Sequence, residues 1–196
     1  VGGWVGCVCR AGLAATRAAR ECLVSACGAV AGAMLGGLGL EKLRIGHATT
    51  LGAASGAVAG LVAITPCAGY VSGLAPLAIG VVAGAVCFLA VSMKFRFGYD
   101  DSLDVIGVHL VGGVLGSLLL GFFADQSINA AGRDGLFSGG GWHLMGEQLL
   151  AVGVTLVFSF IATSVICLVL KALLPGGLRV SEEDEEVGLD LTQHSE

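Results

Sequence analysis

The sequence has few charged residues. Only 13% of its 196 residues are Asp, Glu, Lys or Arg, whereas a soluble domain usually has about 25%. Hydrophobic residues make up 55% of the chain, and the mean hydropathy is +0.88. The ten Lys and Arg are scattered near the ends of apolar segments, so no basic patch predicts binding to nucleic acid. This composition excludes an ordinary soluble domain and favours a membrane protein.

The patterns typical of catalytic and metal sites are also missing. The pair Cys7-Val-Cys9 has no second pair of ligands, which argues against a metal site. Cys22, Cys27, Cys87 and Cys167 fall in apolar segments, where thiols behave as small hydrophobic groups. No nucleophile–base pair is recognisable, and the longest glycine run is not followed by the Lys-Ser/Thr of a phosphate loop. We therefore expect no enzyme activity, no cofactor, no bound metal and no disulfide framework.

Five apolar segments are each near or above the roughly 20 residues that a spanning helix needs. They are residues 22–40, 51–70, 74–93, 103–124 and 146–174. Pro66 predicts that the regular helix of the second segment stops around Ile64. The predicted fold class is all-α: a polytopic membrane helix bundle of about five transmembrane helices. We expect a membrane domain over residues 1–177, atypical in its first 25 residues, and an acidic tail over residues 178–196.

Basic residues predict the orientation of this bundle. They follow the first and third segments, at Lys42, Arg44, Lys94 and Arg96, and flank the end of the fifth, at Lys171 and Arg179. The only basic residue in the loops on the opposite side is Arg133, after the fourth segment. By the positive-inside rule, the tail is expected on the cytoplasmic side of the cell membrane. Arg10, Arg17 and Arg20 conflict with this assignment, because they precede the first segment on the expected outer side.

Glycines repeat every four residues in four of the segments. The pairs and triplets are Gly32 with Gly36, Gly52 with Gly56 and Gly60, Gly80 with Gly84, and Gly112 with Gly116. Such spacing places small residues along one helix face and lets neighbouring backbones approach closely. The stripes therefore predict a tight bundle rather than isolated anchors.

His109 is the only titratable side chain between Val105 and Ala124. An ionisable group inside a spanning helix is costly and usually faces a bundle interior or a pore. The alternative is a packed histidine that is satisfied by a carbonyl group. In an α-helix, Val105 shares the face of His109, whereas Asp104 lies roughly 140° away. Asp104 is therefore expected to cap or brace the start of the segment, with Asp101 and Ser102.

Three ordered motifs resemble the ammonium transporters of the Amt/Mep/Rh family. Residues 51–66 (LGAASGAVAGLVAITP) resemble the eighth helix of the family. Residues 98–109 (GYDDSLDVIGVH), with the glycine pair at 112–113, resemble the tenth. Residues 177–183 (GLRVSEE), followed by GLD at 188–190 and His194, are similar to the family's C-terminal tail.

The resemblance implies that the five segments correspond to helices seven to eleven of an eleven-helix transporter. It implies ammonium or ammonia as the substrate, a lipid bilayer as the surroundings, a homotrimer with one pore in each subunit, and a possible PII-type signalling protein at the cytoplasmic face. His109 matches the second of two paired pore histidines, which form a proton relay. Val105 matches an apolar pore wall, Trp4 a tryptophan of the conduction path, and Asp104 an aspartate that supports that path structurally.

The N-terminal stretch departs from the family pattern. Cys7 replaces a gate phenylalanine, Ala11 replaces a serine of the outer ammonium site, and Arg10 places a cation nearby. Two other interpretations of the chain stay open. One is an ammonium sensor with the same fold, and the other is a truncated product without function, which the altered N-terminal stretch favours. We expect a fragment of this kind to form no selective pathway alone, because the first pore histidine belongs to the half of the family pattern that is absent here.

Overall fold

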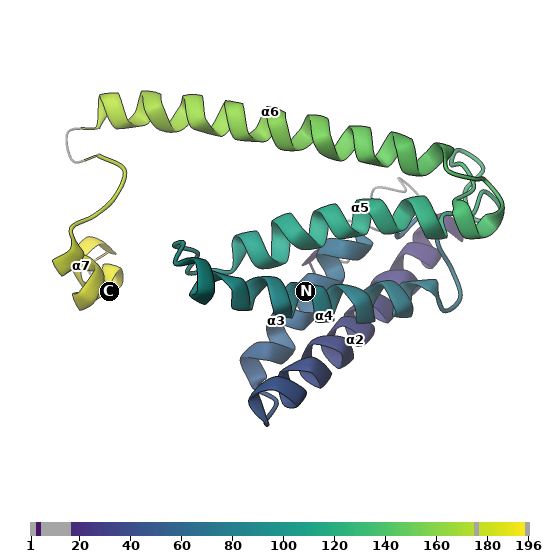
Figure 1. Ribbon diagram of the computed structural model, residues 1–196, viewed down its shortest axis with the longest axis horizontal. Helices are drawn as coiled ribbons and strands as arrows, with labels where there is room; N and C mark the ends of the chain where they lie inside the picture. The colour runs from purple at the N-terminus through teal and green to yellow at the C-terminus, as the bar shows by residue number, and fades with distance from the viewer. Residues whose placement is uncertain (1–2, 5–16, 175–176, 195–196) are drawn as a thin grey trace. The chain divides into compact units, whose positions relative to one another are not determined.

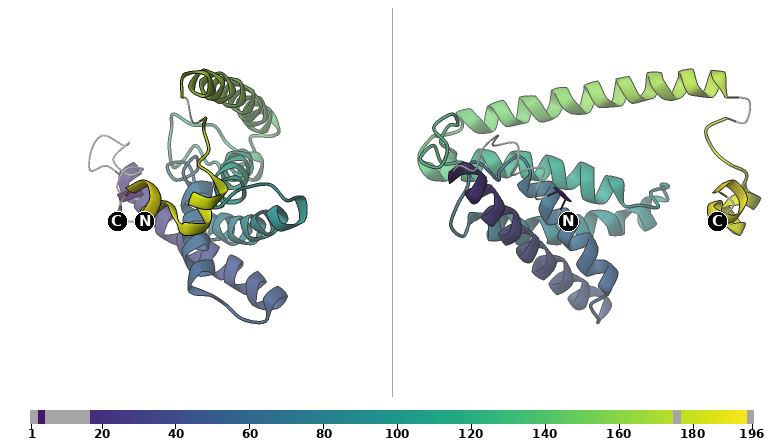
Figure 2. Two further views of the ribbon diagram at one scale, coloured as in Figure 1. Left: turned by 90° about the vertical axis from the view of Figure 1, so that its left-hand side faces the viewer. Right: turned by 180° about the vertical axis from the view of Figure 1, so that it is seen from behind.

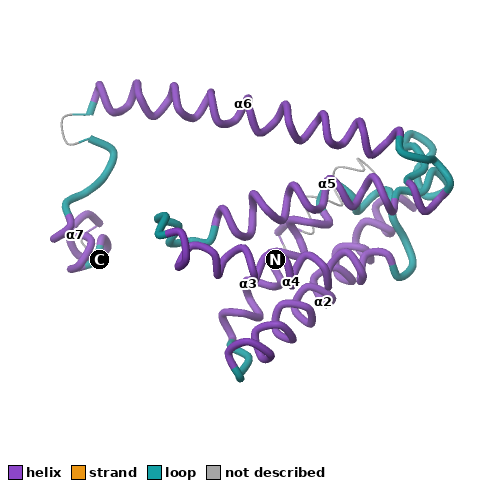
Figure 3. The backbone as a smooth tube through the Cα atoms, in the orientation of Figure 1, coloured by secondary structure: helices purple, strands orange, loops and turns teal. Residues whose placement is uncertain are grey.

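The computed structural model describes residues 3–4, 17–174 and 177–194. In this part of the chain every regular element is a helix, and no strand occurs (Figure 3). The predicted all-α fold class is confirmed. The chain divides into two compact units, Val1–Val152 and Gly153–Glu196. The boundary falls inside helix α6 (His143–Leu173), and the division of the chain at residue 177 stays a prediction.

The first unit contains helices α2 to α5 (Figure 1). Their bounds are Arg17–Ile45 for α2, Thr50–Ile64 for α3, Ala75–Phe97 for α4 and Val111–Phe123 for α5. A π-helix, η1 (Val105–Leu110), precedes α5, and a short 3-10 helix, η2 (Leu136–Ser138), lies in the loop after it. Helix α2 contacts both α3 and α4, and α3 in turn contacts α4 and α5.

Four helices of the described part are long and apolar enough to cross a membrane. They are Ala19–Ile45, Ala75–Phe97, Val105–Phe123 and His143–Leu173. Helix α3 has only 15 residues and ends at Ile64, as Pro66 predicted. The chain continues beyond it through a series of turns, in which the N–H groups of Cys67 and Ala68 both donate to the carbonyl of Ile64 at 2.8 Å.

The glycine stripes bring the helix backbones together, which confirms the predicted close packing (Figure 2). A Cβ added at Gly60 of α3 would lie 2.6 Å from the carbonyl oxygen of Ala29 in α2. A Cβ at Gly80 of α4 would meet the same oxygen, and Gly84 is in the same relation to Ala33. Helix α2 is thus packed between two helices at contacts that only glycine permits.

The second unit contains the later part of α6 and the tail. In the tail, α7 (Glu182–Val187) is capped by Ser181, whose hydroxyl accepts from the N–H of Asp184 at 3.1 Å. The guanidinium of Arg179 donates to both carboxylate oxygens of Glu185, each at 3.0 Å. These hydrogen bonds lower the pKa of the Glu185 carboxyl below its usual value. A second π-helix, η3 (Asp190–His194), follows.

Helix α6 is long and apolar enough to cross a membrane. It has 31 residues, and its buried residues are Leu144 and Met145, both at its start in the first unit. From Gly153 onward it belongs to the second unit, where its apolar side chains include Phe160 and Leu168. A helix of this length and composition supports a membrane protein.

Candidate functional site

His109 lies in the π-helix η1 (Val105–Leu110), which runs directly into α5. The N–H of Val111 donates to the carbonyl of Ile106, five residues earlier, and this spacing defines a π-helix. The α-helical period assumed for residues 103–124 is therefore wrong over these six residues. The angle of roughly 140° expected between Asp104 and His109 around an α-helix therefore does not apply in this segment.

The backbone changes direction at Asp104, the N-cap residue of η1. This residue has a φ of 56° and a ψ of 30°, the left-handed conformation, which costs energy for residues other than glycine and is best tolerated by Asn and Asp. Its carbonyl accepts from the N–H of Val108 at 2.8 Å. Asp104 thus turns the chain sharply into the π-helix.

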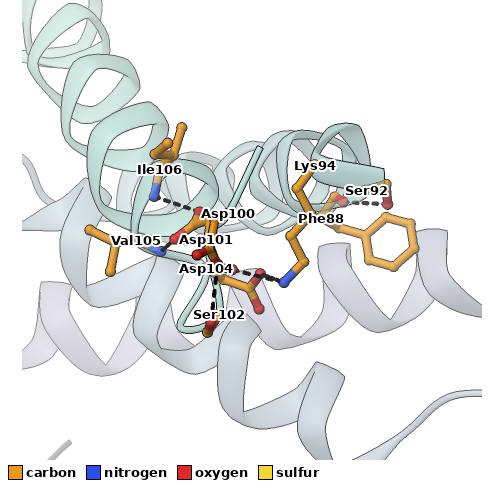
Figure 4. Close-up of polar contacts among 9 residues, drawn as sticks. All are labelled: Phe88, Ser92, Lys94, Asp100, Asp101, Ser102, Asp104, Val105 and Ile106. Atoms are coloured by element: carbon orange, nitrogen blue, oxygen red, sulfur yellow. Dashed lines mark hydrogen bonds and ion pairs between the residues drawn. The ribbon is translucent and has the colours of Figure 1, made fainter. Parts of the chain in front are cut away.

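Asp101 supplies the side-chain cap of η1. Its carboxylate accepts from the N–H of Val105 at 2.8 Å and from the N–H of Ile106 at 2.9 Å (Figure 4). These N–H groups belong to the first turn, where no helical acceptor is available. The side chain of Asp104 makes no capping hydrogen bond, and Ser102 donates instead to Asp100. Of the three residues expected to cap or brace the segment, only Asp101 therefore caps it with its side chain.

Asp104 braces the segment through an ion pair with Lys94 near the end of α4. The Lys94 ammonium lies 2.5 Å from Asp104 Oδ1 and 3.0 Å from the carbonyl oxygen of Asp101 (Figure 4). Sequence reasoning identified Lys94 only as a marker of orientation. The partners are ten positions apart and a turn at Gly98 lies between them, so helical spacing gave no sign of the pair.

The side chains of η1 divide between a buried and an exposed side. Gly107 and Val108 are buried, and a Cβ at Gly107 would lie 2.6 Å from Val91 of α4. Val105 and His109 are both exposed in the described chain, Val105 at 49%. The two residues that the family resemblance assigns to a pore are thus both exposed, whereas Gly107 and Val108 are buried.

Trp4 lies against His109. The two rings are stacked, with centroids 6.1 Å apart and planes 9° from parallel. The indole N–H of Trp4 donates to Thr65 Oγ1 at 3.0 Å, and that hydroxyl donates to the carbonyl of Leu61 at 2.6 Å. Two candidate residues that are 105 positions apart in the sequence, Trp4 and His109, are thereby brought into contact beside the C-terminal end of α3.

A small cavity of about 140 Å³ lies among α2, α3, α4 and η1. Its lining includes Glu41, Asp104 and Val108, but not His109. Glu41 is 5% exposed and accepts from both the N–H (3.0 Å) and the hydroxyl (2.7 Å) of Thr49, the N-cap of α3. Sequence reasoning missed this carboxylate, because Glu41 stands beside Lys42 in a segment that resembles an ordinary helix end.

Some sequence-based expectations concern residues that the structure does not describe. Cys7, Cys9, Arg10 and Ala11 all lie outside the described residues, so their departures from the family pattern stay expectations. Within the described ranges, no group of three His, Cys, Asp or Glu is placed to hold a metal ion. Cys27, Cys67, Cys87 and Cys167 are free thiols.

The sequence and the fold both match known ammonium transporters. The model of the Ammonium Transporter Family matches residues 2–196. The ammonium transporter of Mycobacterium bovis is 48% identical over 199 residues, which cover 99% of this chain and 41% of the relative. That of Bacillus subtilis is 45% identical over 195 residues, which cover 99% and 48%. The crystal structure of Saccharomyces cerevisiae Mep2 matches with a TM-score of 0.84 at 36% identity, over 92% of this chain and 42% of Mep2.

The chain spans somewhat less than half the length of these relatives. The match to the family model nevertheless extends over almost every residue, and the fold agrees with that of a solved member. This chain belongs to the ammonium transporter family.

Proposed function

We propose that the protein takes part in moving ammonium or ammonia across the cell membrane, with His109 as a proton-relay group. The observation that carries this proposal is the exposed imidazole of His109, stacked on Trp4, in a helical segment that is apolar enough to cross a membrane. Membership of the ammonium transporter family names the substrate class.

The physical argument concerns the charge of ammonium. Transfer of a bare cation into a low-dielectric medium costs on the order of 20 kcal/mol before relaxation. A narrow apolar path therefore favours neutral ammonia, provided that a nearby group accepts the proton. An imidazole changes its charge near neutral pH and has two ring nitrogens, so it can receive a proton on one and release another. His109 is proposed to do this while ammonia passes along the apolar wall.

The neighbouring residues have separate proposed roles. Val105, exposed on the same helix, is proposed as an apolar wall of the path. The indole of Trp4 is proposed to line it next to the imidazole and to hold the ring in place by stacking. Asp104, through its pair with Lys94, is proposed as structural support of the path rather than as a proton carrier.

The proposed setting follows the family. A homotrimer in the bilayer is proposed from the family alone. The proposed cytoplasmic location of the acidic tail is consistent with Lys42, Arg44, Lys94 and Arg96 at the ends of α2 and α4. The tail contains a short capped helix, α7, with an internal ion pair. This exposed segment is proposed as part of the surface that a PII-type signalling protein would contact.

The function is tested by joining this chain to the matching N-terminal half of the Bacillus subtilis transporter and recording ammonium-dependent current in proteoliposomes. We expect His109→Ala to abolish the current, or to reduce it at least tenfold, because the proton then has no relay. His47→Ala is the matched control, since His47 is an exposed histidine outside the long apolar helices. Equal currents from the two variants would refute the role of His109.

A further inference from the structure

The segment between α4 and η1 is unusually constrained. Helix α4 ends at Phe97 and is followed by the C-cap residue Gly98, which has a φ of 67°. Asp104 is the only non-glycine residue of the described chain with a positive φ. A conformation of this kind persists only where the surroundings impose it. The group that imposes it must lie in contact with Asp104.

The Lys94 ammonium is the group that contacts Asp104 most directly. It binds the Asp104 carboxylate and, at 3.0 Å, the backbone carbonyl of Asp101. The side chains of the pair are only 17% and 24% exposed, so water screens the pair less than it would on an open surface. Lys94 therefore ties the end of α4 to the residue at which η1 begins and to the residue that caps it (Figure 4).

The direction of His109 depends on this starting point. The carbonyl of Asp104 accepts the N–H of Val108, one residue before His109. A helix whose first residue turns in a different direction presents every later side chain at a different angle. The stacking of His109 on Trp4, with planes 9° from parallel, therefore requires Asp104 to keep its left-handed conformation.

We propose that Lys94 is a positioning residue for His109, acting through Asp104 and the π-helix without touching the imidazole itself. The role of Lys94 in transport rests on the proposed function of His109, but the position of the His109 imidazole can be tested separately. Lys94 fixes where η1 starts, and η1 fixes where the imidazole lies relative to Trp4.

The geometric test uses the chain itself, reconstituted in lipid nanodiscs with isotope-labelled histidine. The NMR signals of the His109 ring are assigned by their loss in His109→Ala. A Trp4→Leu variant gives the ring shifts of an unstacked imidazole. We expect Lys94→Met to move the His109 shifts at least halfway toward the Trp4→Leu values. Lys94→Arg, which keeps a charged donor, should retain most of the stacked shifts.

Arg96→Met is the matched control, because it removes another basic residue from the same last turn of α4. It should leave the His109 shifts in place. If Lys94→Met does not fold, Asp104→Asn provides the second route: it removes the charge of the partner while keeping a side chain that tolerates the left-handed conformation. Stacked shifts in either folded variant would overturn the proposal.

A second readout separates this proposal from the proposed function. In the protein joined to the Bacillus subtilis half, Lys94→Met is expected to lower the maximal ammonium current several-fold and to leave the half-saturating concentration within twofold. A displaced imidazole with an unchanged current would support Lys94 as a positioning residue and contradict the relay role of His109.

Discussion

At the scale of single residues, Asp104 constrains the backbone between α4 and η1 in two ways. It combines a left-handed backbone with an ion pair to Lys94. Replacing it with Gly or Ala removes the ion pair in both cases, but only Ala keeps a Cβ that resists the positive φ. The two substitutions therefore separate the backbone contribution from the electrostatic one.

We expect Asp104→Ala to be less stable than Asp104→Gly by about 1 kcal/mol, because the left-handed conformation costs residues with a Cβ roughly 1–2 kcal/mol relative to glycine. Midpoints of denaturant unfolding in detergent would measure the difference. The same pair of substitutions at exposed Leu103, which lacks a positive φ, should show no such order. An Asp104→Ala variant at least as stable as Asp104→Gly would contradict the argument.

Single residues also show what the sequence could predict. His109 was identified because an imidazole in an apolar run is conspicuous. Lys94 and Glu41 were missed as partners, because their contacts depend on how the chain folds back after α4 and α2. Asp104 and Asp101 were correctly associated with the start of the segment, but the division of labour between them follows from a φ angle that no sequence pattern predicts.

At the scale of elements, the positions of the helices were largely predictable and their internal geometry was not. Apolar run length predicted α2, α4 and α6, and Pro66 predicted the end of α3 at Ile64. The π-helix η1 was not predicted, because an apolar run that is mostly Val, Ile and Gly reads equally well in either helical period. The cap at Asp101 and the left-handed backbone of Asp104 both lie at the start of this wider turn, and the helical period reveals neither.

Helix α2 offers a direct test of glycine packing. A Cβ at Gly32 would meet the backbone of Leu77 and lie 3.1 Å from the N of Val81, whereas a Cβ at Gly39 would meet nothing within 4 Å. We expect Gly32→Ala to destabilise the bundle by about 1–3 kcal/mol through overpacking. Gly39→Ala should be neutral or stabilising by about 0.5–1 kcal/mol.

Thermal unfolding of the two variants, followed by circular dichroism in the same detergent, provides this comparison. The two changes add the same methyl group to the same helix, so general effects of detergent cancel. An equal loss of stability in both variants would show that the α2–α4 contact does not depend on glycine.

At the scale of the whole molecule, the distribution of charge predicts a single orientation in the membrane. Arg44 lies in the last turn of α2 and Glu186 lies in the tail, and both are expected in the cytoplasm. Ser127, in the loop after α5, is expected outside. Since α3 has only 15 helical residues, this arrangement requires the turns at residues 65–70 to complete its crossing.

Labelling of intact cells by a membrane-impermeant thiol reagent would test this orientation. Ser127→Cys should react without permeabilisation, whereas Arg44→Cys and Glu186→Cys should react only after it. The unsubstituted chain gives the background from the native thiols. Labelling of Arg44→Cys and Ser127→Cys under the same condition would show that the segments between them do not cross as proposed.

The π-helix also gives the chain an unusual response to deletions. A π-turn encloses one more residue than an α-turn, so η1 resembles a single-residue insertion that the fold retains. Deleting one residue between Asp104 and Val111 would convert the wide turn into an α-turn and leave α5 in its present orientation, with Gly116 still against Ala63. A deletion inside α5 itself would instead rotate every later residue by about 100°. Deletions in η1 should therefore be tolerated far better than deletions a few residues farther along.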